Sequence, residues 1–233
     1  MGNLISGISS MATRQLLAQL AHAYRQHSGV AVGFESVGGI DAAQRVQAGE
    51  PFDVVVLAAD AIDKLIAGGS VLAGSRMDLV RSPVAIAVRA GAALPDIGSE
   101  DALRRAVLVA GSVGYSTGPS GTALLALFER WGIAGELRSR LVKAPAGVPV
   151  AKLVADGTVE IGFQQLSEML GHPGIVVVGA MPAGCEIVTT FSGGVCAAST
   201  RAAEVGALLA WLQSPATAEA KREQGMDPAE EST

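Results

Sequence analysis

The sequence predicts an α/β fold in which mostly parallel strands alternate with helices and the chain forms two lobes. Short runs rich in Val, Ile and Leu alternate with helical patterns along the 233 residues, as in sheets built with right-handed crossovers. Ala, Val and Leu dominate the 49% hydrophobic content, and 29 Gly accompany them, which suits buried parallel strands and closely packed helices. A chain of this length can bury the core of one large domain or of two lobes of about 100 residues each.

Eight strands are expected where short apolar runs occur. The run at residues 53–57 is typical, because Val54, Val55 and Val56 form a continuous apolar stretch of the kind buried on both faces of a sheet. The eight runs span residues 4–8, 30–34, 53–57, 84–88, 113–115, 160–163, 175–178 and 187–190. No run approaches the roughly 18 apolar residues that a membrane-spanning helix needs.

Helical patterns fill the intervals between these runs. In the first, Leu17, Leu20 and Tyr24 recur at helical spacing, and Ser28-Gly29 is a natural stop. Further helices are expected at residues 41–48, 60–67, 99–106, 120–131, 150–155, 201–212 and 215–224. Ser99 is placed to cap one of them. We expect the polar tail from Met226 onward to be frayed.

Two lobe boundaries are expected from breaks in this pattern. One lies near Arg81-Ser82-Pro83, and the other lies where strand character runs into Ser192-Gly193-Gly194. Lobe 1 would then hold residues 1–81 and 193–233, and lobe 2 residues 82–192, with hinges near 81–83 and 189–193. Two chain crossings between two α/β lobes would place a cleft between them.

Composition and motifs exclude several function classes. The net charge of -5 and the scattered Lys and Arg argue against a nucleic-acid partner. The sequence contains no P-loop, no dinucleotide-binding glycine motif and no nucleophile elbow of a serine hydrolase. Cys185 and Cys196 are expected to be buried free thiols. Neither they nor His22, His27 and His172 have the spacing of metal ligands, so we expect no metal and no cofactor.

Three junctions between a strand and the following helix are rich in Ser and Gly. Such residues often only cap helices and form turns. Three in one chain also indicate an anion site, because N–H groups at a helix start bind anions without Lys or Arg, and ligands of open α/β sheets bind at the carboxyl ends of strands. The candidate ligand-binding residues at these junctions are Ser9, Ser10, Ser36, Gly38, Gly39, Ser116, Ser120, Gly121 and Thr122.

Three other positions have polar side chains that suit an active or binding site. Arg81 could clamp a carboxylate with its bidentate guanidinium or form a hinge ion pair. Glu35 is the one candidate catalytic residue, as a carboxylate whose charge is tuned by burial, although the interpretation as a solvent-facing strand residue is favoured. The uncharged pair Gln164-Gln165 suits hydrogen bonding to the oxygens of a ligand.

Several stretches resemble the molybdate-binding-protein-like branch of the type II periplasmic solute-binding proteins. They are residues 46–55, the Pro119-Ser120-Gly121 loop and residues 155–162, and the resemblance covers nearly the whole chain. It implies a two-lobed fold with two hinge crossings, and a small anion, either a polycarboxylate or a tetrahedral oxyanion such as molybdate, held in a cleft that closes around it. It also implies a monomer, with an ABC transporter membrane component as a partner. The protein is then periplasmic or exported as a mature form, or cytoplasmic if the native gene lacks a signal peptide.

The ligand-binding positions of that family match only in part. Ala12 and Gly39 stand where molybdate binders have serines, with Ser9, Ser10 and Ser36 nearby. The third loop position falls on Ser120, the fourth near Val148, and the tyrosine position holds Gln165.

A closer resemblance is to the subgroup that contains a bacterial aconitate isomerase. It is most specific over residues 162–168, with further matches at residues 61–65, 75–79, 86–89 and 95–97. It favours a small di- or tricarboxylate as the ligand. The alternative function is a cofactor-independent cis/trans isomerase of aconitate or a similar polycarboxylate on the same fold.

Overall fold

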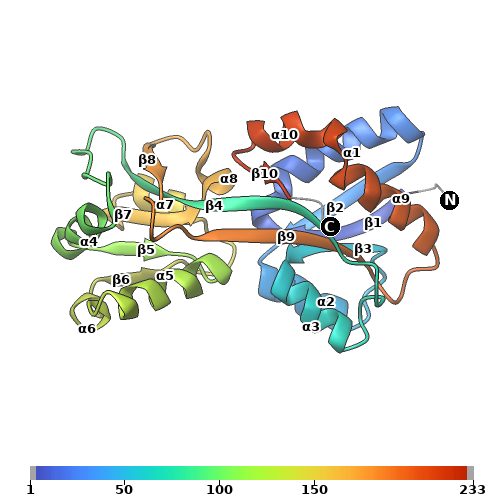
Figure 1. Cartoon of the computed structure of the whole chain (residues 1–233), viewed down its shortest axis with the longest axis horizontal. Helices are drawn as coiled ribbons and strands as arrows, with labels where there is room; N and C mark the ends of the chain where they lie inside the picture. The colour runs from blue at the N-terminus through green and yellow to red at the C-terminus, as the bar shows by residue number, and fades with distance from the viewer. Residues whose placement is uncertain (1–3, 230–233) are drawn as a thin grey trace. The chain divides into compact units, whose positions relative to one another are not determined.

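The computed structural model describes residues 4–229 and divides the chain into two compact units (Figure 1). Unit 1 comprises Met1–Ser82 and Thr190–Thr233, and unit 2 comprises Pro83–Thr189. The boundaries expected from the sequence, after residues 81 and 192, lie one and three residues from these. Residues 1–3 and the last four residues of the expected frayed tail lie outside the described range.

Unit 1 contains a mixed sheet in the order β2 (Ala31–Val37), β1 (Leu4–Ser10), β3 (Val54–Ala58) and β9 (Val188–Val195). The first three strands are parallel, and β9 runs antiparallel to β3. Successive side chains of β3 point to opposite faces, and because both faces are covered by helices all five of its residues are buried. The expected α/β class with a mostly parallel sheet is therefore confirmed.

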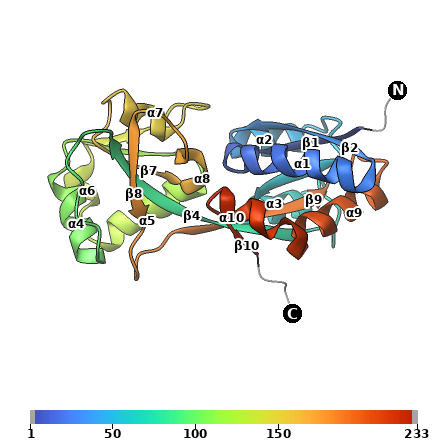
Figure 2. The same cartoon turned by 90° about the horizontal axis from the view of Figure 1, so that it is seen from above.

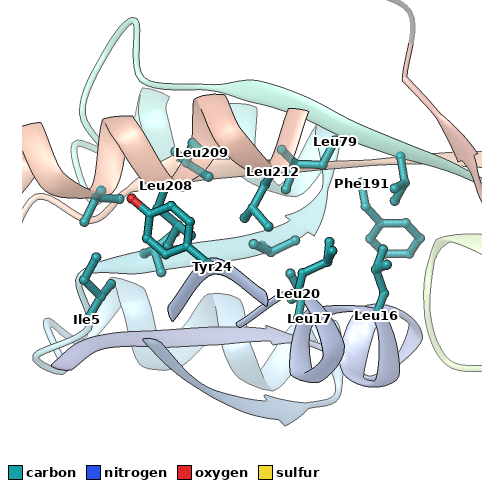
Figure 3. Packing of buried hydrophobic residues seen from close by; sticks show 14 of the residues in the cluster. Ile5, Leu16, Leu17, Leu20, Tyr24, Leu79, Phe191, Leu208, Leu209 and Leu212 are labelled. Atoms are coloured by element: carbon teal, nitrogen blue, oxygen red, sulfur yellow. The ribbon is translucent and has the colours of Figure 1, made fainter. Parts of the chain in front are cut away.

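One face of the unit 1 sheet packs against α1 (Arg14–Ser28) and α9 (Ala202–Gln213), which lie side by side in Figures 1 and 2. Figure 3 shows this core, in which Leu17 and Leu20 of α1 meet Leu208 and Leu212 of α9. The other face packs against α2 (Gly39–Gln47) and α3 (Ala59–Ala67) in a second buried cluster. Helices on both faces leave the carboxyl ends of the parallel strands as the natural binding edge.

Unit 2 repeats this plan with a shorter parallel sheet. Its parallel strands are β6 (Leu141–Lys143), β5 (Val113–Tyr115) and β7 (Ile161–Gln165), and β4 (Met77–Arg89) pairs antiparallel with both β7 and β8 (Ile175–Ala180). The larger core of unit 2 lies under three helices, α4 (Glu100–Val109), α5 (Pro119–Arg130) and α6 (Ala134–Leu137). The opposite face packs against α7 (Val150–Ala155) and α8 (Leu166–Met169).

One strand expectation and the expectation of a frayed tail are corrected by the structure. The strand expected at 84–88 is only part of β4, which begins at Met77. The tail was expected to be frayed from Met226 onward, but residues 226–228 are ordered. Met226 is buried, and β10 (Asp227–Pro228) pairs with Arg81 and Val80 of β4. The chain reaches β10 from α9 through the 3-10 turn Pro215–Thr217 and α10 (Ala218–Glu223).

Several local expectations are confirmed. Gly29 ends α1 with a φ of 76°, and the Ser99 side chain accepts a hydrogen bond from the Ala102 N–H to cap α4. Cys185 and Cys196 are buried and free. Within residues 4–229, no helix has the length and apolar character to cross a membrane.

Candidate functional site

Two serines meet at the carboxyl ends of β1 and β2 in unit 1. The parallel register places Ser9 beside Ser36, and their Oγ atoms are 2.8 Å apart, within hydrogen-bond distance. Ser9 is fully buried, and the Ser10 Oγ accepts a hydrogen bond from the Ala12 N–H at 3.3 Å. We call the residues Ser9, Ser10, Ser36, Gly38 and Gly39 the unit 1 half-site.

The start of α2 completes the unit 1 half-site. Its N-cap is Gly38, which has no side chain to occupy the first N–H groups of the helix, and the Gly38 carbonyl accepts from the Ala42 N–H at 2.9 Å. The first N–H groups of a helix have no partner inside the helix. They and the positive end of the helix dipole therefore favour an anion here.

Unit 2 holds an equivalent arrangement, which we call the unit 2 half-site: Ser116, Ser120, Gly121, Thr122 and Gln165. The Oγ atoms of Ser116 and Ser120 are 2.8 Å apart, and α5 begins between them at Pro119. A Cβ atom at Gly121 would lie 1.9 Å from the Ser116 carbonyl oxygen, so only glycine allows the loop to fold back onto the helix. The Gly121 and Thr122 N–H groups donate to the Gly118 carbonyl at 3.1 and 3.2 Å and are therefore already used within the first turn of α5.

The parallel register of unit 2 brings Gln165 to the same edge. Tyr115 of β5 pairs with Phe163 of β7, so Gln165, the last residue of β7, lies at the same edge as Ser116, which follows the end of β5. Val148, near which the resemblance places the fourth ligand-binding position, lies in the loop that follows β6, and a backbone N–H is what this residue could offer a ligand. That N–H instead donates to the Pro145 carbonyl at 3.0 Å and is used in a turn.

The two neighbouring glutamines differ in their bonding. The carboxamide of Gln164 is used inside unit 2, since its Oε1 accepts from the Ala151 N–H and its Nε2 donates to Glu168 at 2.8 Å. Gln165 is 3% exposed, and its Nε2 donates to the Thr189 Oγ1 at 2.8 Å. No pattern in the sequence singled out Thr189, because it lies 24 residues from Gln165.

The structure does not support burial of Glu35. Its side chain is 52% exposed and pairs with the Arg45 guanidinium, with 3.0 Å between Nη2 and Oε2. Hydrogen bonds from Arg45 lower the pKa of Glu35, so its carboxylate stays ionised rather than serving as a proton donor near neutral pH. The exposed side chain agrees with the favoured interpretation of Glu35 as a solvent-facing strand residue, and not with a carboxylate tuned by burial.

Arg81 lies on β4 with its side chain exposed, and its backbone pairs with Asp227 of β10. Among residues 4–229 it forms no ion pair. In the same range, no group of three or more His, Cys, Asp or Glu side chains could hold a metal ion.

Comparison with known proteins places the chain in a family. The family model described as bacterial extracellular solute-binding protein matches residues 5–227. The chain belongs to this family. An aconitate isomerase from a Pseudomonas species is 37% identical over 227 residues, which cover 95% of this chain and 86% of that protein.

Two solved structures share the fold of this solute-binding protein at low sequence identity. The periplasmic molybdate-binding protein of Azotobacter vinelandii aligns with a TM-score of 0.81 and 18% identity, over 97% of this chain and all of that one. The sulfate-binding protein of Mycobacterium tuberculosis aligns with a TM-score of 0.79 and 16% identity, over 99% of this chain and 88% of that one. The expected likeness to molybdate-binding proteins and to an aconitate isomerase is confirmed.

Proposed function

We propose that this solute-binding protein binds a small anion, with a polycarboxylate favoured over a tetrahedral oxyanion. The observation that carries the proposal is the chemistry of the two half-sites. Each gathers serine hydroxyls and the start of a helix at the carboxyl ends of parallel strands, and neither contains Lys or Arg. Neutral donors of this kind recognise an anion by hydrogen bonds and the helix dipole.

The relatives support the same ligand class. The aconitate isomerase takes its name from a tricarboxylate, and the two structural neighbours are named for molybdate and sulfate. Ala12 and Gly39 replace two serines, and Gln165 replaces the tyrosine, that molybdate binders would carry at these positions, which favours a carboxylate ligand over molybdate.

Isothermal titration calorimetry with molybdate, tungstate, sulfate, citrate, cis-aconitate and trans-aconitate tests this proposal. A Ser36→Ala variant in unit 1 and a Ser120→Ala variant in unit 2 should each lower the affinity for the preferred anion about tenfold, because a hydrogen bond to a charged group is lost. Ser99→Ala is the matched control: it removes a helix-capping hydroxyl outside both half-sites and should lower stability without changing affinity. Tight molybdate binding with no binding of carboxylates would refute the polycarboxylate preference.

An isomerase is the alternative, favoured by the 37% identity to an aconitate isomerase. Moving the double bond of aconitate is an allylic proton shift, which needs an acid/base group beside the carbon acid. Neither half-site contains a titratable side chain, and Glu35 is exposed and ion-paired, so simple binding is favoured. An NMR time course of cis-aconitate tests the alternative. Conversion at a rate proportional to protein concentration would establish the isomerase and overturn the binding-only proposal.

We also propose that the protein works outside the cytoplasm as a monomer and delivers its ligand to a membrane component of an ABC transporter. The family description, which names extracellular proteins, supports the compartment. Fractionation of native cells with N-terminal sequencing of the recovered protein is the test. Recovery of the full-length chain in the cytoplasmic fraction would refute it.

A further inference from the structure

A buried carbonyl oxygen in unit 2 has no partner. The Gln165 Oε1 is inaccessible to solvent and accepts no hydrogen bond within residues 4–229, although the rest of the side chain is held in place. A buried acceptor left unpaired costs about 1–3 kcal/mol, so such atoms are rare in folded proteins unless a ligand or water completes them. The position of Gln165 at the edge of the unit 2 half-site indicates a ligand.

The contact with Thr189 occupies one end of the Gln165 carboxamide. The Gln165 Nε2 donates to the Thr189 Oγ1 at 2.8 Å, which leaves Oε1 as the unpaired atom. The neighbouring Gln164 has both ends of its carboxamide bonded within unit 2, so the open oxygen is a property of Gln165 and not of the strand end as a whole.

A carbonyl oxygen can only accept a hydrogen bond, and a deprotonated carboxylate or sulfate oxygen has no hydrogen to give. We propose that Gln165, oriented by Thr189, is a specificity residue for an anion that carries an O–H group beside its negative charge, such as a hydroxy-polycarboxylate. This inference rests on the proposed function and narrows its ligand class. The fully ionised form of aconitate offers no O–H group and would not make this contact.

The opposite orientation of the carboxamide makes the opposite prediction. A rotation of 180° about the last side-chain bond would let the Thr189 hydroxyl donate to Oε1 and would turn the Gln165 Nε2 toward the ligand. The half-site would then prefer oxygens without hydrogens. The two orientations are therefore distinguished by pairs of ligands that differ in one O–H group.

Calorimetric titration with two such pairs is the test. Citrate is compared with tricarballylate, which lacks only the hydroxyl, and hydrogen phosphate is compared with sulfate. In whichever pair binds, the member with the O–H group should bind about three- to tenfold more tightly, as expected for one net hydrogen bond. Equal affinities, or a preference for the member without O–H, would overturn the inference while leaving anion binding intact. Absence of binding by all four probes and by the aconitates and molybdate would instead overturn the proposed function.

Two substitutions separate recognition from a structural role. Gln165→Met removes the acceptor and should abolish the preference. Gln165→Glu keeps an acceptor and adds a negative charge. It should therefore lower the affinity for every anion but retain the preference for the ligand with the O–H group. The control is Gln213→Met, which removes a carboxamide from unit 1 that donates to the Asp78 carbonyl, and it should leave the preference unchanged. A preference that persists in Gln165→Met would overturn the inference.

Discussion

Replacing Lys221 with methionine should stabilise the protein. Lys221 lies on α10 and is 1% exposed, and its Nζ has no hydrogen-bond partner within the described range. Lys221 lines a small cavity together with Leu16, Leu17, Leu20, Val56 and Leu212, and Thr13 is the other polar residue of its lining. A buried ammonium without a partner is costly, and methionine fills a similar volume without a charge.

The size of the effect follows from the pKa. Burial lowers the pKa of Lys221 from 10.5 to about 8. Each pKa unit corresponds to about 1.4 kcal/mol, so the charged amine costs about 3 kcal/mol in the folded state at neutral pH. This is a large fraction of the roughly 5–15 kcal/mol by which a domain is stable. The gain from Lys221→Met should therefore be about 3 kcal/mol at pH 7.

The lowered pKa of Lys221 also predicts how the stability gain from Lys221→Met changes with pH. Below pH 8 the amine is charged in both the folded and the unfolded chain, so the full penalty is present. Between pH 8 and pH 10.5 the folded state loses its proton first, and the penalty is progressively released. The advantage of Lys221→Met should therefore shrink through this window and disappear near its upper end.

Urea unfolding of wild type and Lys221→Met at several pH values from 6 to 10 measures this difference, because the titrations of all other groups cancel in the comparison. Lys64→Met is the control: it removes an exposed lysine paired with Asp60 and should change stability little. A variant that is less stable than wild type at pH 7, or whose advantage is the same at pH 7 and pH 10, would refute the reasoning.

Three further predictions concern the half-site of unit 2 and the thiols. Ser120→Asp should weaken anion binding at least tenfold by calorimetry, because it places a like charge in the loop; unchanged affinity would contradict the proposed site. Gly121→Ala should lower the free energy of unfolding by about 1–3 kcal/mol, because the new Cβ meets the Ser116 carbonyl; a wild-type urea midpoint would contradict it. Burial raises the pKa of Cys185 to about 11 and of Cys196 to about 12, so both should react with a disulfide reagent at pH 8 only after unfolding; rapid reaction of the folded protein would contradict this.

Most strands were predictable because buried parallel strands are continuous apolar runs. The three-residue β6 was missed, since Leu141 and Val142 alone make too short a signal and are only partly buried. The first half of β4 was missed because it carries polar residues that find partners far along the chain. Asp78 in this half accepts from the Ser192 hydroxyl at 2.6 Å, 114 residues away, in addition to its ion pair with the nearby Arg76.

The candidate site was predictable where a local rule applied. Serines and glycines after a parallel strand meet at one sheet edge, and this brings Ser9 to Ser36 and Ser116 to Ser120. Glu35 is exposed, as the solvent-facing interpretation expected, because β2 is the edge strand of its sheet. The Thr189 contact depends on tertiary packing and leaves no local signal.

The neutrality of the two half-sites has a consequence for the charge of the loaded protein. An anion held by hydroxyls and backbone N–H groups keeps its full charge, because no Lys or Arg side chain of the half-sites neutralises it. The complex is then more negative than the free chain, whose net charge is already -5. Loaded and free molecules should consequently separate by native electrophoresis, and a receiving partner with a basic surface could distinguish them by electrostatics alone.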